Sequence, residues 1–324
     1  MTSIPTIDVH VAPTDRMSAL TSDVRAGLTA TPKSLPPVWF YDERGSRLFD
    51  EITRLPEYYV TRAEHSILAA NADEIAIRAG ADVLVEIGSG TSEKTRLLLD
   101  AMTRSSALQR FVPFDISEET LRDAAVAIAN TYDVAVHAVV GDFQRHVGDL
   151  PRDGRRLVAF LGSTIGNLTP AQRHRFFVDL DAAMAHNEWL LLGTDLVKDP
   201  RRLLAAYDDA QGVTAEFNRN VLYVLNRELD ATFDPEAFDH VAAWNDDEQW
   251  IEMRLRSRFA QRATIGALDL EVVFEAGEDL LTEISAKFTP ERIRNELGDS
   301  GFVVEETWTD SGSDFLLTLA RPYC

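Results

Sequence analysis

Two glycines that follow a hydrophobic segment are the residues best suited to binding a ligand. Val83–Ile87 is typical of a buried strand, and Gly88 and Gly90 come directly after it, before a helix that we expect to begin near Thr91 or Ser92. Glycine lets the backbone approach a ligand and adopt positive φ. The first turn of a helix offers free N–H groups. This combination forms the ligand-binding crevice of a doubly wound α/β sheet, although an ordinary strand–turn–helix corner is the alternative.

The loop lacks the features of a phosphate site. A dinucleotide fingerprint, G-x-G-x-x-G, would need a glycine where Glu93 stands, and the pattern of a P-loop is absent. A carboxylate near a helix start also repels pyrophosphate. Glu86 lies two residues before Gly88, so the loop resembles the E/D-x-G-x-G opening of S-adenosylmethionine (SAM) methyltransferases. SAM carries a sulfonium cation and no phosphate, so an acidic loop suits it.

Acidic residues also end the next two predicted strands. Asp115 follows the strand expected at 110–116, where an acid can accept hydrogen bonds from ribose hydroxyls. Asp142 and Phe143 follow the strand expected at 134–140, where they suit an adenine amino group and its ring. Aspartates at such positions also cap helices, and this remains the alternative for each.

A neutral polar loop follows the fourth predicted strand. Ser163, Thr164 and Asn167 supply hydroxyl and amide groups and no strong base. This composition favours positioning of an amine lone pair over deprotonation of a carbon. The alternative is a plain connection that ends in the helix start at Thr169 and Pro170.

Composition narrows the partners. The chain has 324 residues, 45% hydrophobic and 26% charged, with a formal charge of −21. That charge disfavours nucleic acid and anionic membranes as partners. No apolar run approaches the 18 residues of a membrane span, and no signal peptide is recognisable. The single cysteine, Cys324, fits a reducing cytosol. With seven scattered histidines we expect no metal site, and we expect a cytoplasmic monomer.

The order of the predicted elements indicates the fold class. Seven strands are expected, at 82–87, 110–116, 134–140, 156–161, 189–196, 302–309 and 315–320. The first five alternate with helices, as βαβ units do, and the last two form a hairpin. We therefore predict an α/β protein with a seven-stranded, Rossmann-like SAM methyltransferase sheet and a second, α+β substrate-binding lobe.

The boundaries follow from a long insertion before the hairpin. We expect 61–197 to be the SAM-binding domain and 288–324 to complete its sheet. Residues 198–287 form an inserted lobe, helical at first, with strands near 250–257, 268–275 and 280–287. We assign residues 1–60 to the same lobe.

A set of longer motifs carries a family resemblance. In order they are TPKSLPP (31–37), WFYD (39–42), LPEYY (55–59), EIGSGTSEK (86–94), GSTIGNLT (162–169), GTDLVKD (193–199), YDD (207–209) and FNRN (217–220). With these motifs the chain closely resembles the bacterial L-histidine Nα-methyltransferases of ergothioneine biosynthesis, over about residues 20 to 320. The resemblance implies three successive methyl transfers from SAM to the histidine α-amine, which give hercynine.

The resemblance also implies the site residues. Those that would hold SAM are Gly88, Lys94, Asp115, Asp142 and Phe143. Those that would hold histidine are Tyr58, Asn167, Tyr207, Glu283 and Ser285, with Tyr41 and Met253 lining the pocket. Asn167 and Tyr41 are the residues expected nearest the chemistry. As alternate residues of one expected strand, Glu283 and Ser285 share a face and could engage both imidazole nitrogens.

Two other functions stay open at this point. One is N-methylation of another aromatic amino acid, such as a tryptophan derivative. Glu283 argues against it because an indole offers one donor and no acceptor. The other is a SAM- or nucleotide-binding regulator without catalytic activity. The base that deprotonates the amine is not identified by any residue; solvent and the substrate carboxylate are both open.

Overall fold

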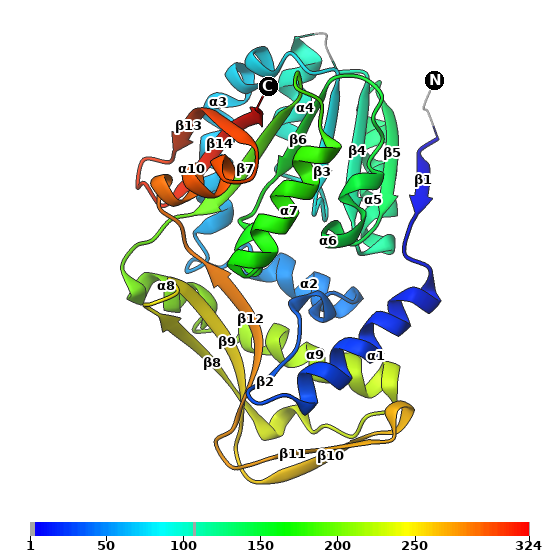
Figure 1. Cartoon of the computed structure of the whole chain (residues 1–324), viewed down its shortest axis with the longest axis vertical. Helices are drawn as coiled ribbons and strands as arrows, with labels where there is room; N and C mark the ends of the chain where they lie inside the picture. The colour runs from blue at the N-terminus through cyan, green and yellow to red at the C-terminus, as the bar shows by residue number, and fades with distance from the viewer. Residues whose placement is uncertain (1–3, 106–107, 324) are drawn as a thin grey trace. The chain divides into compact units, whose positions relative to one another are not determined.

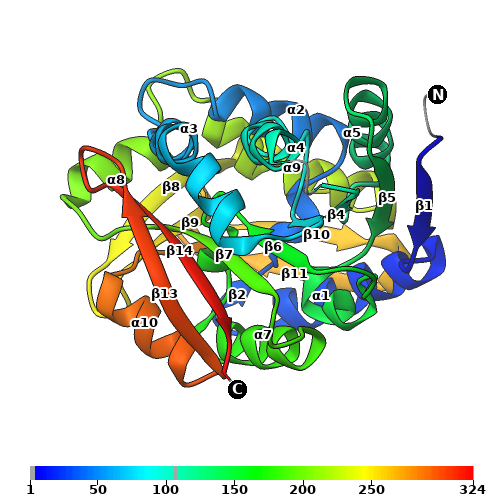
Figure 2. The same ribbon diagram turned by 90° about the horizontal axis from the view of Figure 1, so that it is seen from above.

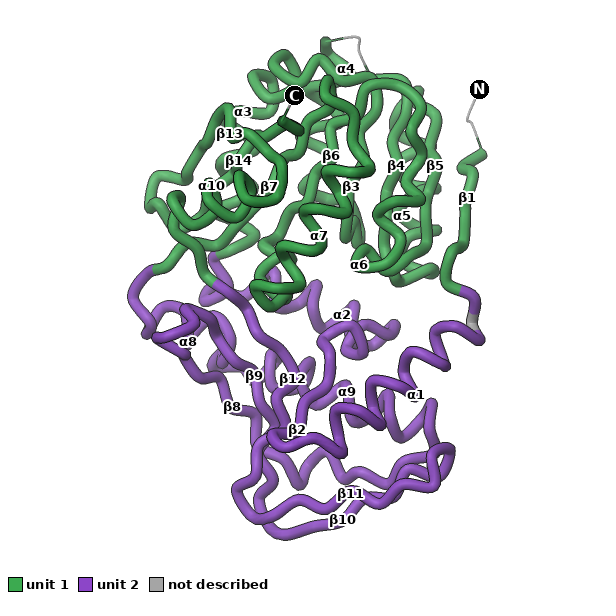
Figure 3. The backbone as a smooth tube through the Cα atoms, viewed as in Figure 1, with its two compact units in different colours: residues 1–11, 60–197, 287–324 green, residues 12–59, 198–286 purple. Residues whose placement is uncertain are grey.

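The computed structural model describes residues 4–105 and 108–323, so Cys324 lies outside the described residues. The chain forms two compact units, which Figure 3 colours separately. Unit 1 comprises Met1–Val11, Val60–Val197 and Lys287–Cys324, and unit 2 comprises Ala12–Tyr59 and Lys198–Ala286. Each unit is therefore built from segments that are far apart in the sequence.

Unit 1 is built on one mixed sheet with the strand order β1-β5-β4-β3-β6-β7-β14-β13 (Figure 1). Its strands are β1 (Thr6–Val9), β3 (Val83–Ile87), β4 (Arg110–Asp115), β5 (Ala135–Val140), β6 (Arg156–Phe160), β7 (Trp189–Asp195), β13 (Phe302–Thr309) and β14 (Phe315–Pro322). The first six are parallel, and β14 runs antiparallel to both of its neighbours. Every residue of β3 and of β6 is buried, as expected for central strands covered on both faces. The predicted fold class and all seven predicted strands are confirmed.

Helices cover both faces of this sheet. Figure 2 shows α3, α4 and α5 on one face and α7 and α10 on the other. The helices of unit 1 are α3 (Val60–Ala79), α4 (Arg96–Arg104), α5 (Glu118–Thr131), α6 (Phe143–His146), α7 (Pro170–Ala183) and α10 (Pro290–Gly298), with short 3₁₀ turns η2 (Val147–Asp149) and η3 (Thr164–Asn167). The sheet is therefore doubly wound, and its ligand crevice is expected where the winding reverses, between β3 and β6.

Two expectations about unit 1 were wrong in detail. Residues 1–60 were assigned to the second lobe, but β1 pairs in parallel with β5 at the edge of the main sheet (Figure 1). The helix expected to begin near Thr91 or Ser92 begins at Arg96. The cause is local, because Ser92 has a φ of 54°, which a right-handed helix cannot contain.

Unit 2 combines a four-stranded sheet, β2-β12-β9-β8, with a hairpin, β10-β11, and helices packed against them. Its helical elements are α1 (Pro13–Thr29), η1 (Pro37–Phe40), α2 (Glu43–Ile52), α8 (Pro200–Tyr207), α9 (Val213–Leu229), η4 (Pro235–Ala237) and η5 (Gly266–Leu268). Its strands are β2 (Lys33–Ser34), β8 (Phe238–Asn245), β9 (Trp250–Ser257), β10 (Gln261–Ile265), β11 (Leu270–Phe274) and β12 (Asp279–Ala286). The predicted α+β character and three predicted strands are present, whereas β2, β8 and β10 were not anticipated.

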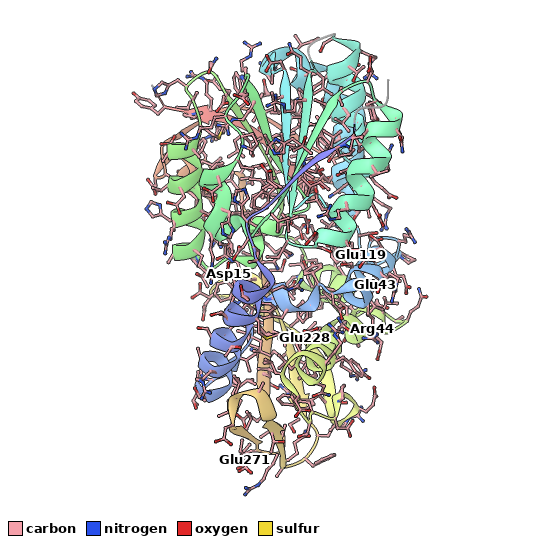
Figure 4. The ribbon with its side chains drawn as sticks, turned by 90° about the vertical axis from the view of Figure 1, so that its right-hand side faces the viewer. Asp15, Glu43, Arg44, Glu119, Glu228 and Glu271 are labelled. Carbon is pink, nitrogen blue, oxygen red and sulfur yellow. The ribbon has the colours of Figure 1, made fainter. Side chains whose placement is uncertain are left out.

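Polar contacts join the two sequence segments of unit 2. Arg44 of α2 donates to Glu216 Oε2 and to Asn220 Oδ1 of α9, each at 2.8 Å (Figure 4 labels Arg44). Asn220 is wholly buried and donates to the Phe40 carbonyl at 2.9 Å. The segments before residue 60 and after residue 197 therefore make one folded body.

None of the described helices is both long enough and apolar enough to cross a membrane.

A buried ion pair lies at the end of the sheet where β6 and β7 begin. Arg156 Nε and Nη2 donate to the two carboxylate oxygens of Glu188, each at 2.6 Å, and both side chains are nearly inaccessible. The remaining groups are also satisfied, because Arg156 donates to the Ala183 carbonyl and Glu188 accepts from the Ala185 amide. Removing one member would leave a buried charge without its partner.

We expect Glu188→Gln to lower the free energy of unfolding by about 3–5 kcal/mol, because the Arg156 charge stays buried and loses its counter-ion. Glu305→Gln is the matched control, since its pair with Arg321 is about one-third exposed and should contribute less than about 1 kcal/mol. Urea unfolding of both variants measures the difference. An equal loss in the free energy of unfolding for both variants would show that burial of the Arg156–Glu188 pair does not increase the cost of breaking it.

Candidate active site

The glycine turn after β3 leaves open space beside the backbone. Gly88 and Gly90 have φ of 68° and 49°, and a Cβ added at either would meet no atom within 4 Å. The amides of Gly88 and Ser89 donate to the Phe114 carbonyl at 2.8 and 3.1 Å. The turn is thus pinned to the end of β4 while its other side stays clear. This is the geometry that close approach of a ligand to a backbone requires.

Asp115 organises this turn from the end of β4. Its Oδ2 accepts the Gly90 amide and its Oδ1 accepts the Ser117 amide, both at 2.9 Å. Burial raises the pKa of the Asp115 carboxyl, and the hydrogen bonds from backbone amides act in the opposite direction. Asp115 therefore lies at the end of β4 beside the glycine turn, and its carboxylate holds that turn.

Asp142 and Phe143 follow β5 on the same edge of the sheet. Asp142 caps the short helix α6 by accepting the Gln144 amide at 2.9 Å, so the alternative role of a helix cap is present. The ring of Phe143 contacts Phe160 and Phe176, with centroid distances of 5.2 and 5.7 Å. The ring of Phe143 is thus held in place by two other aromatic side chains.

Glu86 is a buried carboxyl directly before the turn. The Thr95 hydroxyl donates to its Oε1, and Oε2 has no partner among the described residues. Burial raises the pKa of Glu86 to about 7, against smaller opposing effects that include the Thr95 hydrogen bond and the Lys94 charge. The group is therefore close to half-protonated at neutral pH, and a cation bound nearby would favour its charged form.

The loop after β6 lies beside the glycine turn, because β3 and β6 are neighbours. Gly162 and Ser163 both have positive φ, 74° and 59°. The Ser163 hydroxyl accepts the Asp195 amide at 3.0 Å, and Asn167 ends the 3₁₀ turn η3. The alternative reading of the end of this loop is confirmed, since Thr169 forms a capping box with Gln172 at the start of α7. Asn167 is not part of that cap.

Four of the expected substrate residues meet in unit 2. Tyr207 and Ser285 share a buried hydrogen bond of 2.7 Å between their hydroxyl oxygens. Glu283 on β12 is paired with Met253 on β9 across the antiparallel ladder. Beyond Glu283 the strand is regular, so its side chain and that of Ser285 point to one face.

The other two expected substrate residues of unit 2 continue this group through aromatic contacts. Tyr58 lies edge-on to Tyr207, with ring centroids 6.4 Å apart. Phe49 links Tyr58 to Tyr41, at 6.3 and 5.8 Å. The structure therefore brings all six into one cluster within unit 2, whereas the six others lie in unit 1: Gly88, Lys94, Asp115, Asp142, Phe143 and Asn167.

Comparison with known proteins identifies the family. A family model described as "Histidine-specific methyltransferase, SAM-dependent" matches residues 20–322. The chain belongs to this family. The predicted resemblance is confirmed, and SAM is the cofactor of this SAM-dependent methyltransferase.

Two curated relatives match this chain over most of their length. The chain is 59% identical to "Histidine N-alpha-methyltransferase" of Mycolicibacterium smegmatis, covering 96% of this chain and 97% of the relative. It is 57% identical to the protein of the same name from Mycobacterium tuberculosis, covering 93% and 94%. It is also 33% identical to "Ergothioneine biosynthesis protein 1" of Neurospora crassa, where the match covers 62% of this chain and 24% of the relative.

The glycine turn of this methyltransferase fits SAM on its own chemistry. Gly88 and Gly90 face open space, and the buried Ser89 hydroxyl between them has no hydrogen-bond partner among the described residues. Asp115 supplies a carboxylate beside them. An open backbone, an unpaired buried hydroxyl and acidic groups suit a cationic ligand with hydroxyls better than a phosphate. Among the described residues, no group of three or more His, Cys, Asp and Glu side chains could hold a metal ion.

Sequence reasoning missed a polar network behind the unit 2 cluster. A bulge in β12 leaves Thr282 without a cross-strand partner, and its hydroxyl donates to Asn218 Oδ1 at 2.6 Å. The Asn218 amide donates to His240 Nδ1 at 2.9 Å, and His240 Nε2 faces the Tyr207 carbonyl at 2.8 Å. Burial lowers the pKa of His240, which keeps the ring neutral. The network thus ties the backbone of Tyr207 to the strand that carries Glu283, and no local pattern in the sequence predicts it.

A second missed residue is Glu64 on α3, whose carboxylate contacts Lys94 and the Gly162 amide. A signal was available, because Val60, Ala63, Ile67 and Leu68 place Glu64 within an apolar stripe at helical spacing. A carboxylate on such a stripe must be buried with its partners.

We expect Asp115→Ala to raise the SAM dissociation constant by about 10- to 100-fold, since hydrogen bonds to a charged acceptor contribute about 1.5–3 kcal/mol. Asp115→Asn, which retains one acceptor oxygen, should have a smaller effect. Calorimetric titration with SAM measures both, and Asp123→Ala, which removes an exposed acid from α5, controls for net charge. Unchanged SAM affinity in Asp115→Ala would remove this residue from the site.

Glu86 predicts a pH dependence of stability in the SAM-free protein. Its folded pKa of about 7 exceeds its ordinary value of 4.5. The contribution of Glu86 to the free energy of unfolding is therefore fully present below pH 4.5. It is lost as pH rises through 7, by about 3 kcal/mol in all. Unfolding in urea at several pH values should show this loss in the wild type and not in Glu86→Gln. Parallel curves for the two proteins would mean that Glu86 titrates normally.

Proposed function

We propose that this protein transfers three methyl groups from SAM to the α-amino group of L-histidine and so makes hercynine, the first step of ergothioneine biosynthesis. The observation that carries the proposal is the match to two mycobacterial histidine N-alpha-methyltransferases at 59% and 57% identity over nearly the whole of each chain. The Neurospora crassa relative, named for ergothioneine biosynthesis, supports the pathway.

Each proposed cofactor residue contacts a different part of SAM. SAM, when bound, supplies an electrophilic methyl group on a sulfonium centre. We propose that Asp115 accepts hydrogen bonds from the ribose hydroxyls and that Asp142 and Phe143 hold the adenine. Gly88 allows the close backbone approach, and the Lys94 ammonium attracts the carboxylate end of the cofactor.

The residues of unit 2 are proposed to hold the amino acid. Glu283 accepts an imidazole N–H in a charge-assisted hydrogen bond, and Ser285 contacts the other ring nitrogen. Tyr207 already shares a hydrogen bond with Ser285, so it fixes that hydroxyl. Tyr58 lies against Tyr207, and Met253 provides an adaptable apolar wall beside Glu283.

We propose that two residues act nearest the chemistry. In the first two transfers the Asn167 amide oxygen accepts a hydrogen bond from an amine N–H and directs the nitrogen lone pair at the methyl group, while Tyr41 lines the pocket. Orientation of the two reactants converts a bimolecular step into an effectively unimolecular one. The proton that the amine must lose goes to solvent or to the substrate carboxylate.

We further propose that the enzyme works in the cytoplasm as a monomer and does not bind nucleic acid. The formal charge of −21 is unfavourable for a polyanionic partner, and a chain with one cysteine suits a reducing compartment.

Mass spectrometry of amino acids incubated with SAM and the protein tests the proposed function. We expect additions of one, two and three methyl groups to histidine alone among a panel that includes tryptophan. A chelator should not reduce the yield, because the sulfonium methyl is already activated. Methylation of a different amino acid would replace the substrate, and SAM binding without turnover of any of them would favour a regulator.

Substrate choice should reside in Glu283 and Met253. We expect the double variant Glu283→Ala, Met253→Val to lower the specificity constant for histidine and to raise that for tryptophan relative to it. A pocket that bonds a polar ring rejects a ring that leaves its buried groups unpaired, and that penalty disappears with the carboxylate. Glu271→Ala on the exposed face of β11 is the control. A constant ratio of the two specificity constants would place the imidazole elsewhere.

A further inference from the structure

Glu64 is a fully buried carboxylate in the middle of helix α3, and its side chain has no exposed surface. A buried carboxylate is costly unless its oxygens are paired. The cost is not recovered as stability, because a buried ion pair is seldom better than apolar packing. Stability of the core of unit 1 therefore does not explain why a carboxylate is buried at this position.

The two oxygens of Glu64 contact two different loops. Oε2 forms an ion pair with Lys94 of the glycine loop, and Oε1 accepts the Gly162 amide of the loop after β6 at 2.7 Å. Lys94 also approaches the second loop directly, since a Cβ on Gly162 would lie 3.4 Å from its Nζ. One carboxylate thus joins the loops that follow β3 and β6.

The sheet leaves a place for this carboxylate. Gly193 lies in the central part of β7, and a methyl group there would collide with Glu64 Oε1. Gly162 keeps a φ of 74°, so its amide direction is set by a conformation that other residues adopt only with strain. Glycines at positions 162 and 193 therefore make space for the Glu64 carboxylate.

We propose that Glu64 is a positioning residue of the methyl transfer. It holds Lys94 at the cofactor and, through Gly162, holds the backbone from which Asn167 reaches the acceptor amine. The proposal rests on the proposed function for the roles of Lys94 and Asn167. Glu64 thus positions the loop after β3, which would bind SAM, relative to the loop after β6, which would contact the amine. Loss of its contact to Lys94 should therefore affect SAM binding, and loss of its contact to Gly162 should affect kcat.

Two substitutions separate the contacts. Glu64→Gln keeps an oxygen that can accept the Gly162 amide but removes the charge that holds Lys94. We expect the SAM dissociation constant to rise by about tenfold, within the range of coupling energies for contacting pairs, with kcat at saturating SAM nearly unchanged. Glu64→Ala loses both contacts, so kcat should also fall by about tenfold or more.

A double-mutant cycle with Lys94→Met supplies the decisive measurement. Because Glu64 acts on SAM through Lys94, Glu64→Gln should weaken SAM binding little further in the Lys94→Met background. Glu74→Gln, an exposed acid on the same helix that pairs with Arg78, is the matched control and should behave as wild type. All assays are run below the thermal midpoint of each variant, which is measured without SAM.

Additive effects in the cycle, or wild-type SAM affinity in Glu64→Gln, would overturn the role at Lys94. A fall in kcat as large in Glu64→Gln as in Glu64→Ala would overturn the role at Gly162. If Glu64→Ala does not fold, Glu64→Gln and the cycle still decide. Calorimetry with SAM needs no acceptor, so a failure of the wild type to methylate histidine would refute the proposed function and leave the test of the Glu64–Lys94 contact valid.

Discussion

The open backbone at Gly88 and Gly90 is the constraint on which the rest of unit 1 depends. A ligand can approach this turn only while no side chain occupies the space beside it, and positive φ at both glycines turns the chain away. The loop must then be held from the opposite side, which the Phe114 carbonyl and the Asp115 carboxylate do. The positive φ of Ser92 delays the following helix until Arg96, so Lys94 belongs to the loop.

Two sets of buried charges lie at opposite ends of the sheet of unit 1. Arg156 and Glu188 stand where β6 and β7 begin, and they satisfy each other and nearby backbone carbonyls and amides. Glu64 and Glu86 stand where β3 and β6 end, the edge at which doubly wound sheets bind ligands. Both oxygens of Glu64 are paired, but Glu86 Oε2 has no partner among the described residues, and burial raises the pKa of Glu86 to about 7. The carboxyl of Glu86, unlike that of Glu188, can therefore still respond to a bound cation, which would favour its charged form.

Unit 2 contains a buried polar network that connects its strands and helices. The bulge at Thr282 releases one hydroxyl from the ladder of β12, and that hydroxyl bonds to Asn218. Asn218 and His240 then connect this strand to the carbonyl of Tyr207. Buried networks of this kind are favourable only when their groups are satisfied, so Tyr207 and Ser285 are held in one geometry before any substrate binds.

The sequence by itself determined the strands and turns whose formation depends on residues close together in the chain. The seven strands of the main sheet and the glycine turn were predictable, because a buried strand appears in the sequence as an apolar run. The positions of Asp115 and Asp142 at the ends of β4 and β5 followed from the same runs. The family motifs supplied the candidate substrate residues, and Tyr207, Ser285, Glu283 and Met253 do lie together.

Only the tertiary structure decided the features that join distant segments. The pairing of β1 with β5 links residues more than a hundred positions apart, and a four-residue strand carries no pattern that names its partner. The bulge at Thr282 depends on the register between β9 and β12. The apolar stripe of α3 marks Glu64 as buried, but only the folded chain shows that Lys94 and Gly162 lie at its two oxygens. The physical reason is the same in each case: periodicity reports which face of an element is buried, but the identity of the groups across that face is set by the packing of the whole unit.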